Sequence, residues 1–267
     1  YLATDEKLGR KVAVKALALT EEFEGEALEE AQARFRREAE AAARLNHPNI
    51  VTIYEAGEDH DLAYIAMDYV EGESLEDATD ADDLLPVWDV LEIGIQVADA
   101  LDYAHDKQVV HRDVKPSNII YDTETGTVKV TDFGIACLTD SSRTRTGTVL
   151  GTPSYMSPEQ AAGKKLDGRS DLFSLGVTLY QLLTGRLPFV GDSLANLIYR
   201  ITTQKHPALK TIRPDLNASI SRVMNKVLQK NPDDRYATGA ELAEALTRCQ
   251  EKVKRVVRKP RSSRTPA

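Results

Sequence analysis

The stretch VVHRDVKPSNII, residues 109–120, sets a row of polar side chains between two pairs of β-branched residues. Asp113 is followed two residues later by Lys115 and five residues later by Asn118. Because β-branched pairs favour strands, these polar residues are expected in a rigid loop at a strand edge. Such a loop can serve catalysis or merely cap the strands, and this stretch alone does not decide between the two.

A second motif, VKVTDFGIA at residues 128–136, adds a carboxylate, Asp132, at the end of a β-branched strand. Phosphoryl transfer requires a carboxylate at the accepting hydroxyl, a cation near the transferred phosphate and oxygen ligands for Mg²⁺. Asp113, Lys115 and Asn118 supply these groups in one loop, and Asp132 offers a further metal ligand. Together the two motifs predict a site for phosphoryl transfer.

Composition limits the class of protein. The chain has 267 residues, of which 42% are hydrophobic and 28% charged, as expected for a soluble globular protein with one large core or two smaller ones. Two cysteines, Cys137 and Cys249, make a disulfide framework implausible, and no Cys/His cluster has zinc-ligand spacing. We see no apolar run long enough for a membrane span and no signal peptide, so the predicted setting is the reducing cytoplasm.

The charge is unevenly distributed along the chain. Residues 251–267 carry seven Lys or Arg against one Glu, a net charge of +6, which leaves −14 for the rest of a chain whose total is −8. An acidic body disfavours nucleic-acid binding. The basic tail has two interpretations: a disordered linker, or a juxtamembrane segment that precedes a membrane tether beyond residue 267.

The apolar pattern changes once along the chain. Residues 1–67 predict a short opening strand, a strand over 10–17, a helix over 29–45 and strands over 49–57 and 62–67, whereas helical spacing dominates from residue 84 onward. We therefore predict an α+β fold with a small β-rich lobe and hinge at 1–70, a mainly helical lobe at 71–250 and the basic tail at 251–267.

Several motifs occur in a fixed order: VAVK at 12–15, HRDVKPSN at 111–118, DFG at 132–134 and a Pro-Glu pair at 158–159. In this order they resemble a eukaryotic-like (Hanks-type) serine/threonine protein kinase of the bacterial receptor type, from Val12 to Arg235. The resemblance implies a two-lobed protein kinase fold, with an antiparallel sheet and helix C in the small lobe. It also implies transfer of phosphate from ATP to protein Ser/Thr hydroxyls, with Mg²⁺ or alternatively Mn²⁺.

The resemblance places the nucleotide phosphates at Lys15 of VAVK. Glu38, in the predicted helix before NHPNI, matches the helix-C glutamate and is expected to pair with Lys15 in the active state. The alternative for Glu38 is one of many solvated glutamates on an acidic helix.

The adenine is expected between the lobes. By resemblance, Ala13 covers the ring, Met67 occupies the gatekeeper position, and Asp68 to Val70 form the hinge whose backbone bonds the base. Ile120 is grouped with them as a nucleotide contact.

The catalytic roles follow from the same comparison. Asp113 matches the catalytic base, Lys115 the cation on the transferred phosphate, and Asn118 with Asp132 the metal ligands. Thr152 matches a threonine that contacts the catalytic Asp and Lys. Both Lys115 and Thr152 favour Ser/Thr over Tyr as the acceptor.

Other matches are interpreted as structural. His111 and Phe133 are expected to pack in an apolar spine, Glu159 to pair with Arg235, and Asp171 to anchor the backbone of the catalytic loop. The remaining histidines are interpreted as structural or surface residues: His47, His60, His105 and His206.

Regulation is predicted in the segment TDSSRTRTGTVLGTPSYMSPEQ, residues 139–160. Arg112 precedes the catalytic Asp, and kinases with this arginine typically need a loop phosphate to neutralise it. Thr144 and Thr146 match the paired autophosphorylation positions best, ahead of Ser142 and Thr148. The alternative is a polar loop that is rich in threonine by composition alone.

Two departures from the family pattern occur. SPE replaces the commoner Ala-Pro-Glu. No glycine-rich G-x-G-x-x-G precedes Lys15, and we expect the reason to be that the sequence omits an N-terminal segment.

Expected partners are protein substrates and a second copy phosphorylated in trans. Two other functions stay open: a pseudokinase scaffold and a small-molecule kinase of the same fold.

Overall fold

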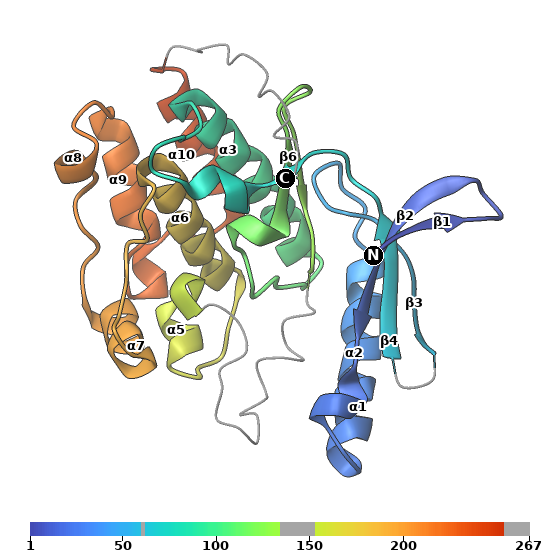
Figure 1. Ribbon diagram of the computed structural model, residues 1–267. Helices are drawn as coiled ribbons and strands as arrows, with labels where there is room; N and C mark the ends of the chain where they lie inside the picture. Colours follow the sequence, from blue (N-terminus) through green and yellow to red (C-terminus); the bar gives the residue numbers. More distant parts are fainter. Residues whose placement is uncertain (60–61, 134–152, 254–267) are drawn as a thin grey trace.

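The structure is a computed structural model that describes residues 1–59, 62–133 and 153–253. It divides them into a small lobe with a β-sheet and a larger helical lobe (Figure 1). This arrangement confirms the predicted two-lobed α+β fold. Within the described residues, no helix has the length and apolar character needed to cross a membrane.

The small lobe is built on an antiparallel sheet of four strands in the order β1-β2-β4-β3. Strand β4 buries alternate residues, Ala63, Ile65 and Met67, as a strand with one covered face should. Helix α2 covers that face with Phe35 and Ala39, which belong to the same apolar cluster. The elements are β1 (Leu2–Asp5), β2 (Arg10–Leu17), α1 (Leu19–Glu22), α2 (Glu26–Ala43), β3 (Ile53–Asp59) and β4 (Leu62–Asp68).

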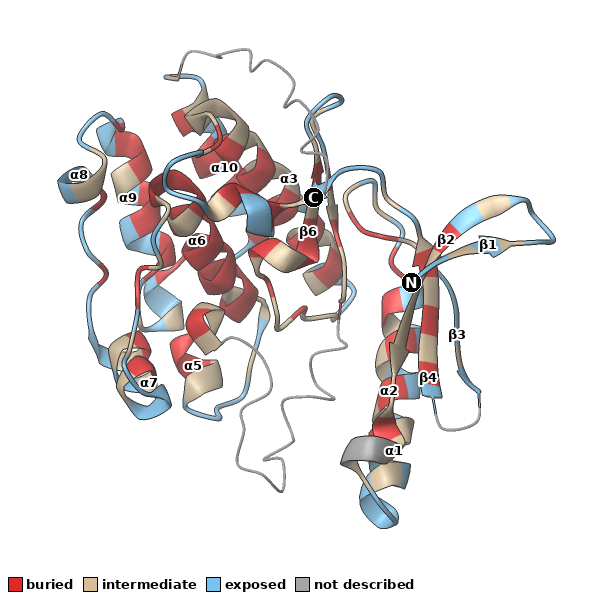
Figure 2. Cartoon of the chain, in the orientation of Figure 1, coloured by how far each residue is buried: buried red, intermediate tan, exposed pale blue. Residues whose placement is uncertain are grey.

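The large lobe surrounds helix α6, which is buried on nearly every side (Figure 2). Its apolar residues form part of the large core, and α3 packs against both α6 and α10. The helices are α3 (Val87–Asp106), α5 (Pro158–Ala161), α6 (Gly168–Thr184), α7 (Leu194–Thr203), α8 (Leu209–Ile212), α9 (Ala218–Val227) and α10 (Gly239–Gln250).

A second, smaller sheet carries the polar motifs on the large lobe. Its three strands have the order β5-β6-β7, and two of the 3-10 helices, η1 and η2, pack against it. The strands are β5 (Glu73–Ser74), β6 (Ile119–Asp122) and β7 (Thr127–Val130), and the 3-10 helices are η1 (Leu75–Thr79), η2 (Pro116–Asn118), η3 (Pro153–Tyr155) and η4 (Pro232–Asp234).

The two lobes are joined by backbone hydrogen bonds at β7. The Val51 amide donates to the Val130 carbonyl at 3.0 Å, and the Val130 amide donates to the Asn49 carbonyl at 2.8 Å. Ile50, between them, belongs to the apolar core of the large lobe. The chain leaves β7 toward Asp132, so this predicted metal ligand lies where the lobes meet.

Candidate active site

The catalytic loop after helix α3 is held by one buried carboxylate. Asp171, in the first turn of α6, is 1% exposed and accepts the backbone amides of His111 at 2.8 Å and Arg112 at 2.7 Å. The His105 ring also contacts it, with Nε2 2.7 Å from Oδ2. Buried polar groups of this kind are stable only when their partners are present. The predicted contact between Asp171 and the loop backbone is therefore present.

The loop is also joined to the strand that carries Asp132. The His111 ring, fully buried, places Nε2 2.7 Å from the Thr131 carbonyl and lies 4.5 Å from the Phe133 ring between centroids. These two rings pack as expected for structural residues. Asp132 itself has a φ of +64°, a left-handed conformation that non-glycine residues adopt only under local constraint.

Asp113 is the meeting point of the polar groups in the loop. The Lys115 Nζ lies 2.6 Å from Asp113 Oδ2, and the Asn118 amide donates to the same oxygen at 3.0 Å. The Asn118 amide also donates to the Asp113 backbone carbonyl at 2.8 Å. The structure thus brings the predicted base, cation and amide into one cluster, in which the carboxylate is partly exposed.

The fit of the site to a divalent cation can be judged from its donors. Asn118 is buried, and because its Nδ2 is committed to Asp113, its carbonyl oxygen is the atom left to bind a cation. Asp132 adds carboxylate oxygens. Mg²⁺ prefers oxygen ligands and usually takes only one or two from the protein, with the rest from phosphates and water. The two residues fit such an ion.

The predicted ion pair between Lys15 and Glu38 is not present in this structure. Lys15 Nζ lies 2.8 Å from Asp132 Oδ2, while Glu38 Oε1 lies 3.3 Å from Arg112 Nη1. In this arrangement Arg112, from the catalytic loop, contacts the Glu38 carboxylate instead. The pairing of Glu38 with Lys15 was predicted for the active state and stays a prediction. Both ion pairs are partly exposed, so water screens each of them, and an exchange of partners changes the free energy little.

The predicted adenine residues lie next to one another on the sheet. Ala13 on β2 is paired directly with Met67 on β4, and Val70, just beyond β4, packs on the same apolar cluster. The Asp68 amide donates to the Thr52 carbonyl at 2.9 Å, so this hinge amide is already bonded within the small lobe. Ile120 lies on β6 of the large lobe.

The predicted pair of Glu159 and Arg235 is present and deeply buried. Arg235 Nη1 and Nη2 each lie 2.7 Å from a carboxylate oxygen of Glu159, and the Ser170 hydroxyl donates to the same carboxylate at 2.6 Å. Burial alone would raise the pKa of Glu159, but the hydrogen bonds from Arg235 and Ser170 outweigh burial and lower it. The pair ties α5 to the loop before α10.

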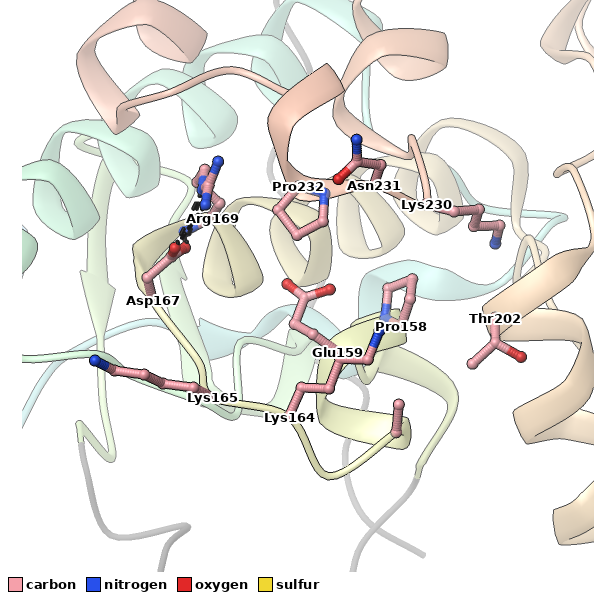
Figure 3. Close-up of a pocket in the computed structure, with 11 residues that line it drawn as sticks. Pro158, Glu159, Lys164, Lys165, Asp167, Arg169, Thr202, Lys230, Asn231 and Pro232 are labelled. Atoms are coloured by element: carbon pink, nitrogen blue, oxygen red, sulfur yellow. Dashed lines mark hydrogen bonds and ion pairs between the residues drawn. The ribbon is translucent and has the colours of Figure 1, made fainter.

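A cavity of about 450 Å³ opens beside this ion pair, between α5, α7 and η4 (Figure 3). Glu159, Lys164, Lys165, Lys230 and Asn231 are among its lining residues. Burial and the nearby charge of Arg235 lower the pKa of Lys230 to about 8. None of the described lining residues is a predicted nucleotide or metal ligand, so this cavity is separate from the candidate active site.

Sequence reasoning missed one residue at the site and did not foresee the contact of another. His105 was interpreted as a structural or surface residue, and it is structural: its ring bonds Asp171, and Gly168 lies so close that an added Cβ would meet His105 Nδ1 at 2.4 Å. Gln160 drew no attention, yet its side chain bonds the catalytic loop. No sequence signal marks either contact, because each depends on how α3, α5 and α6 pack.

Six residues with a predicted role lie outside the part of the chain that the structure describes. They are His60, Thr152, the paired Thr144 and Thr146, and the alternatives Ser142 and Thr148. Most of the basic tail, residues 254–267, also lies outside it. Their predicted roles stay predictions.

Comparison with known proteins finds one family. Residues 1–247 match the family described as protein kinase domain. The chain is 42% identical over 243 residues to the serine/threonine-protein kinase PrkC of Bacillus subtilis, covering 91% of this chain and 37% of that protein. It is 42% identical over 258 residues to the serine/threonine-protein kinase PknB of Mycobacterium leprae, covering 93% and 40%. It thus spans about two fifths of these curated relatives.

Among solved structures, the chain is similar to a crystal structure of Rad53 residues 1–466 in complex with AMP-PNP. The TM-score is 0.74 at 27% sequence identity, and the match covers 91% of this chain and 60% of that one. The order of sheet, helix C and helical lobe is therefore shared with that structure.

Proposed function

This chain belongs to the protein kinase domain family, and from that premise we propose that it transfers the γ-phosphate of ATP to serine and threonine side chains of proteins. The observation that carries the proposal is the cluster in which Asp113 contacts both Lys115 and Asn118. The names of the relatives, serine/threonine-protein kinases, support hydroxyl groups of Ser and Thr as the acceptors.

Each group in the cluster has a role in the proposed reaction. The Asp113 carboxylate takes the proton from the attacking hydroxyl, and the Lys115 ammonium neutralises charge on the transferred phosphate. Lys115 lies 2.6 Å from Asp113, so the proposed base and the proposed cation are adjacent in the loop. Asn118 holds the Asp113 carboxylate and backbone in place through one amide.

ATP is proposed to bind between the lobes, with its base near Ala13 and Met67 and its phosphates near Lys15. Mg²⁺, for which Mn²⁺ can substitute, would be held by Asn118 and Asp132 and would neutralise phosphate charge when bound. Lys15 Nζ lies 2.8 Å from Asp132 Oδ2, so the lysine proposed to bind the phosphates and the carboxylate proposed to bind the metal are adjacent.

Autophosphorylation is proposed to regulate the site through Arg112. A phosphate on Thr144 or Thr146 would attract the Arg112 guanidinium, because a phosphate dianion binds arginine more strongly than a carboxylate does. Arg112 now contacts Glu38, so its withdrawal would leave Glu38 to Lys15. Modification in trans, by a second copy, supplies the phosphate.

The setting of the kinase is a further part of the proposal. Protein substrates are its partners, and the acidic body, with net charge −14 outside the basic tail, disfavours nucleic acid. We place the activity in the cytoplasm, with the basic tail either a linker or a juxtamembrane segment leading to a membrane tether.

The test is phosphoryl transfer by the natural full-length protein with Mg-ATP, beside an Asp113→Asn variant. Removal of the base should lower kcat by about 10²–10⁴-fold, as general-base loss typically does. Asp82→Asn, at an exposed turn, is the matched control and should keep its activity. Phosphopeptide mapping of the products then reports whether Thr144 and Thr146 carry phosphate.

Two results would contradict the proposal in different ways. A folded protein that binds ATP but transfers nothing would favour the scaffold alternative. A fully active enzyme with no phosphate at residues 139–152 would remove the proposed regulation and leave the transfer reaction intact.

A further inference from the structure

The Gln160 side chain makes two hydrogen bonds, as the acceptor in one and the donor in the other. Its Oε1 accepts from the Ser157 amide at 3.0 Å, and its Nε2 donates to the Arg112 carbonyl at 2.7 Å. Because an amide N–H can only donate and a carbonyl can only accept, the two partners fix the orientation of the Gln160 amide. The first bond belongs to the capping box of α5, while the second reaches the catalytic loop, 48 residues away in sequence.

The carbonyl that Gln160 reaches belongs to a constrained residue. Arg112 has a φ of +70°, a left-handed conformation that costs energy for any residue except glycine and must be held by its surroundings. Asp171 holds the Arg112 amide at 2.7 Å, and Gln160 holds the Arg112 carbonyl at 2.7 Å. Asp171 thus bonds the amide, and Gln160 the carbonyl, of Arg112, the residue that precedes Asp113.

The other contacts of α5 make Gln160 a rigid support. Ser157 is fully buried and its hydroxyl accepts from the Gln160 backbone amide at 3.2 Å, while Glu159 is locked to Arg235. The Gln160 side chain therefore starts from a fixed backbone and ends on the peptide group between Arg112 and Asp113. A displacement of about 1 Å at a catalytic group can reduce the rate of an enzyme up to about 100-fold.

We propose that Gln160 is a positioning residue for phosphoryl transfer, because its amide donates to the carbonyl of the peptide that carries Asp113. The proposal rests on the proposed function. The competing explanation is that Gln160 only caps α5 through Ser157. The positioning role depends on the Nε2 donor of the Gln160 amide, and the capping role depends on its Oε1 acceptor. Substitutions that preserve one of these two groups at a time can therefore separate the explanations.

The experiment compares Gln160→Glu with Gln160→Lys in the full-length protein. Glu keeps an oxygen for the Ser157 amide but turns a second oxygen toward the Arg112 carbonyl, where it cannot donate. Lys supplies a donor for the carbonyl but has no acceptor for Ser157. Gln229→Glu is the matched control, because Gln229 is exposed and also donates its amide to a carbonyl, that of Asn225.

We expect Gln160→Glu to lower kcat about tenfold, with KM for ATP within about twofold of the parent, since the lost bond affects the position of Asp113 rather than the nucleotide. Gln160→Lys should retain most of kcat while its Tm falls, because only the cap is lost. Gln229→Glu should match the parent in both measurements. A merely structural role predicts the reverse order, with kcat falling with Tm in Gln160→Lys and unchanged in Gln160→Glu.

A second measurement does not depend on turnover. Amide hydrogen exchange of the peptide spanning residues 109–118 should be faster in Gln160→Glu and unchanged in Gln160→Lys. Unchanged exchange and unchanged kcat in Gln160→Glu would overturn the positioning role. A parent protein that shows no phosphoryl transfer would instead contradict the proposed function, and the exchange data would still decide the role of Gln160.

Discussion

The catalytic loop of the large lobe and the Lys15 region of the small lobe hold their charges in different ways. In the loop, Asp171 is 1% exposed and bonds two backbone amides and a histidine ring. In the small lobe, the Lys15 side chain is 37% exposed and pairs with Asp132, while Glu38 pairs with Arg112. Buried polar groups have fixed partners, whereas partly exposed ions can exchange theirs.

This difference has an energetic basis. Removal of one partner from a buried ion pair leaves an uncompensated charge and typically costs about 3–5 kcal/mol, whereas an exposed pair contributes about 0–1 kcal/mol. The buried contacts of the large lobe therefore keep one set of partners, whereas the two partly exposed pairs between the lobes can exchange theirs at little cost in free energy.

The largest effect is expected at the buried pair of the large lobe. Arg235→Met should lower the free energy of unfolding by about 3–5 kcal/mol, because Glu159 would remain buried without its cation. Urea denaturation monitored by circular dichroism measures it. Arg248→Met, which breaks an exposed pair with Glu244, is the matched control and should cost less than about 0.5 kcal/mol. Equal losses in the two variants would contradict the distinction between buried and exposed ions.

The next effect is expected at the anchor of the catalytic loop. Asp171→Asn should lower the free energy of unfolding by about 1–3 kcal/mol and also lower kcat, because one of its two acceptor oxygens becomes a donor facing groups that donate. Denaturation and steady-state kinetics on the same preparations test both. A variant with reduced stability and unchanged kcat would show that the anchor stabilises the lobe without positioning the loop.

Contacts inside the large lobe were predictable because both partners of each contact belong to sequence motifs. Glu159 with Arg235, and Asp171 with the loop, join residues that the sequence pattern had already singled out, and burial favours hydrogen bonding between them. The two-lobed fold was predictable for a different reason, because the apolar pattern changes once along the chain.

The remaining contacts depend on the packing of separate elements. Whether Glu38 contacts Lys15 or Arg112 depends on which of two partly exposed cations lies nearer, and one-dimensional spacing carries no such information. Gln160 was missed, and the partner of His105 was not foreseen, because a single polar residue on a helix usually faces solvent. Their roles emerge only when α3, α5 and α6 are placed around the loop.

A smaller effect is expected from pH at the buried pair. The pKa of Glu159 is lowered from its ordinary value of 4.5, so the ionised form stabilises the folded state fully above pH 4.5. This contribution is lost as the pH falls through the lower, folded-state pKa. The free energy of unfolding of the parent should therefore fall more steeply with acid below pH 4.5 than that of Glu159→Gln. Parallel curves for the two proteins would contradict the lowered pKa.

The smallest change in stability is expected in the small lobe. Arg112→Gln should change the free energy of unfolding by no more than about 1 kcal/mol, because the pair it breaks is partly exposed. It should nevertheless redirect Glu38 to Lys15. A double-mutant cycle with Lys15→Met and Glu38→Gln measures the coupling of that pair, which should be near zero in the parent and about 0.5 kcal/mol in the Arg112→Gln background.

The comparison of the two backgrounds separates exchange from simple loss. If Arg112 and Lys15 compete for Glu38, the removal of one cation creates a coupling that the parent lacks, although no atom of the new pair has been altered. If the coupling is the same in both backgrounds, Glu38 does not exchange between cations, and the small lobe is as fixed as the catalytic loop. A loop phosphate could then not act on Lys15 through Arg112, and another route between the segment and the nucleotide site would be required.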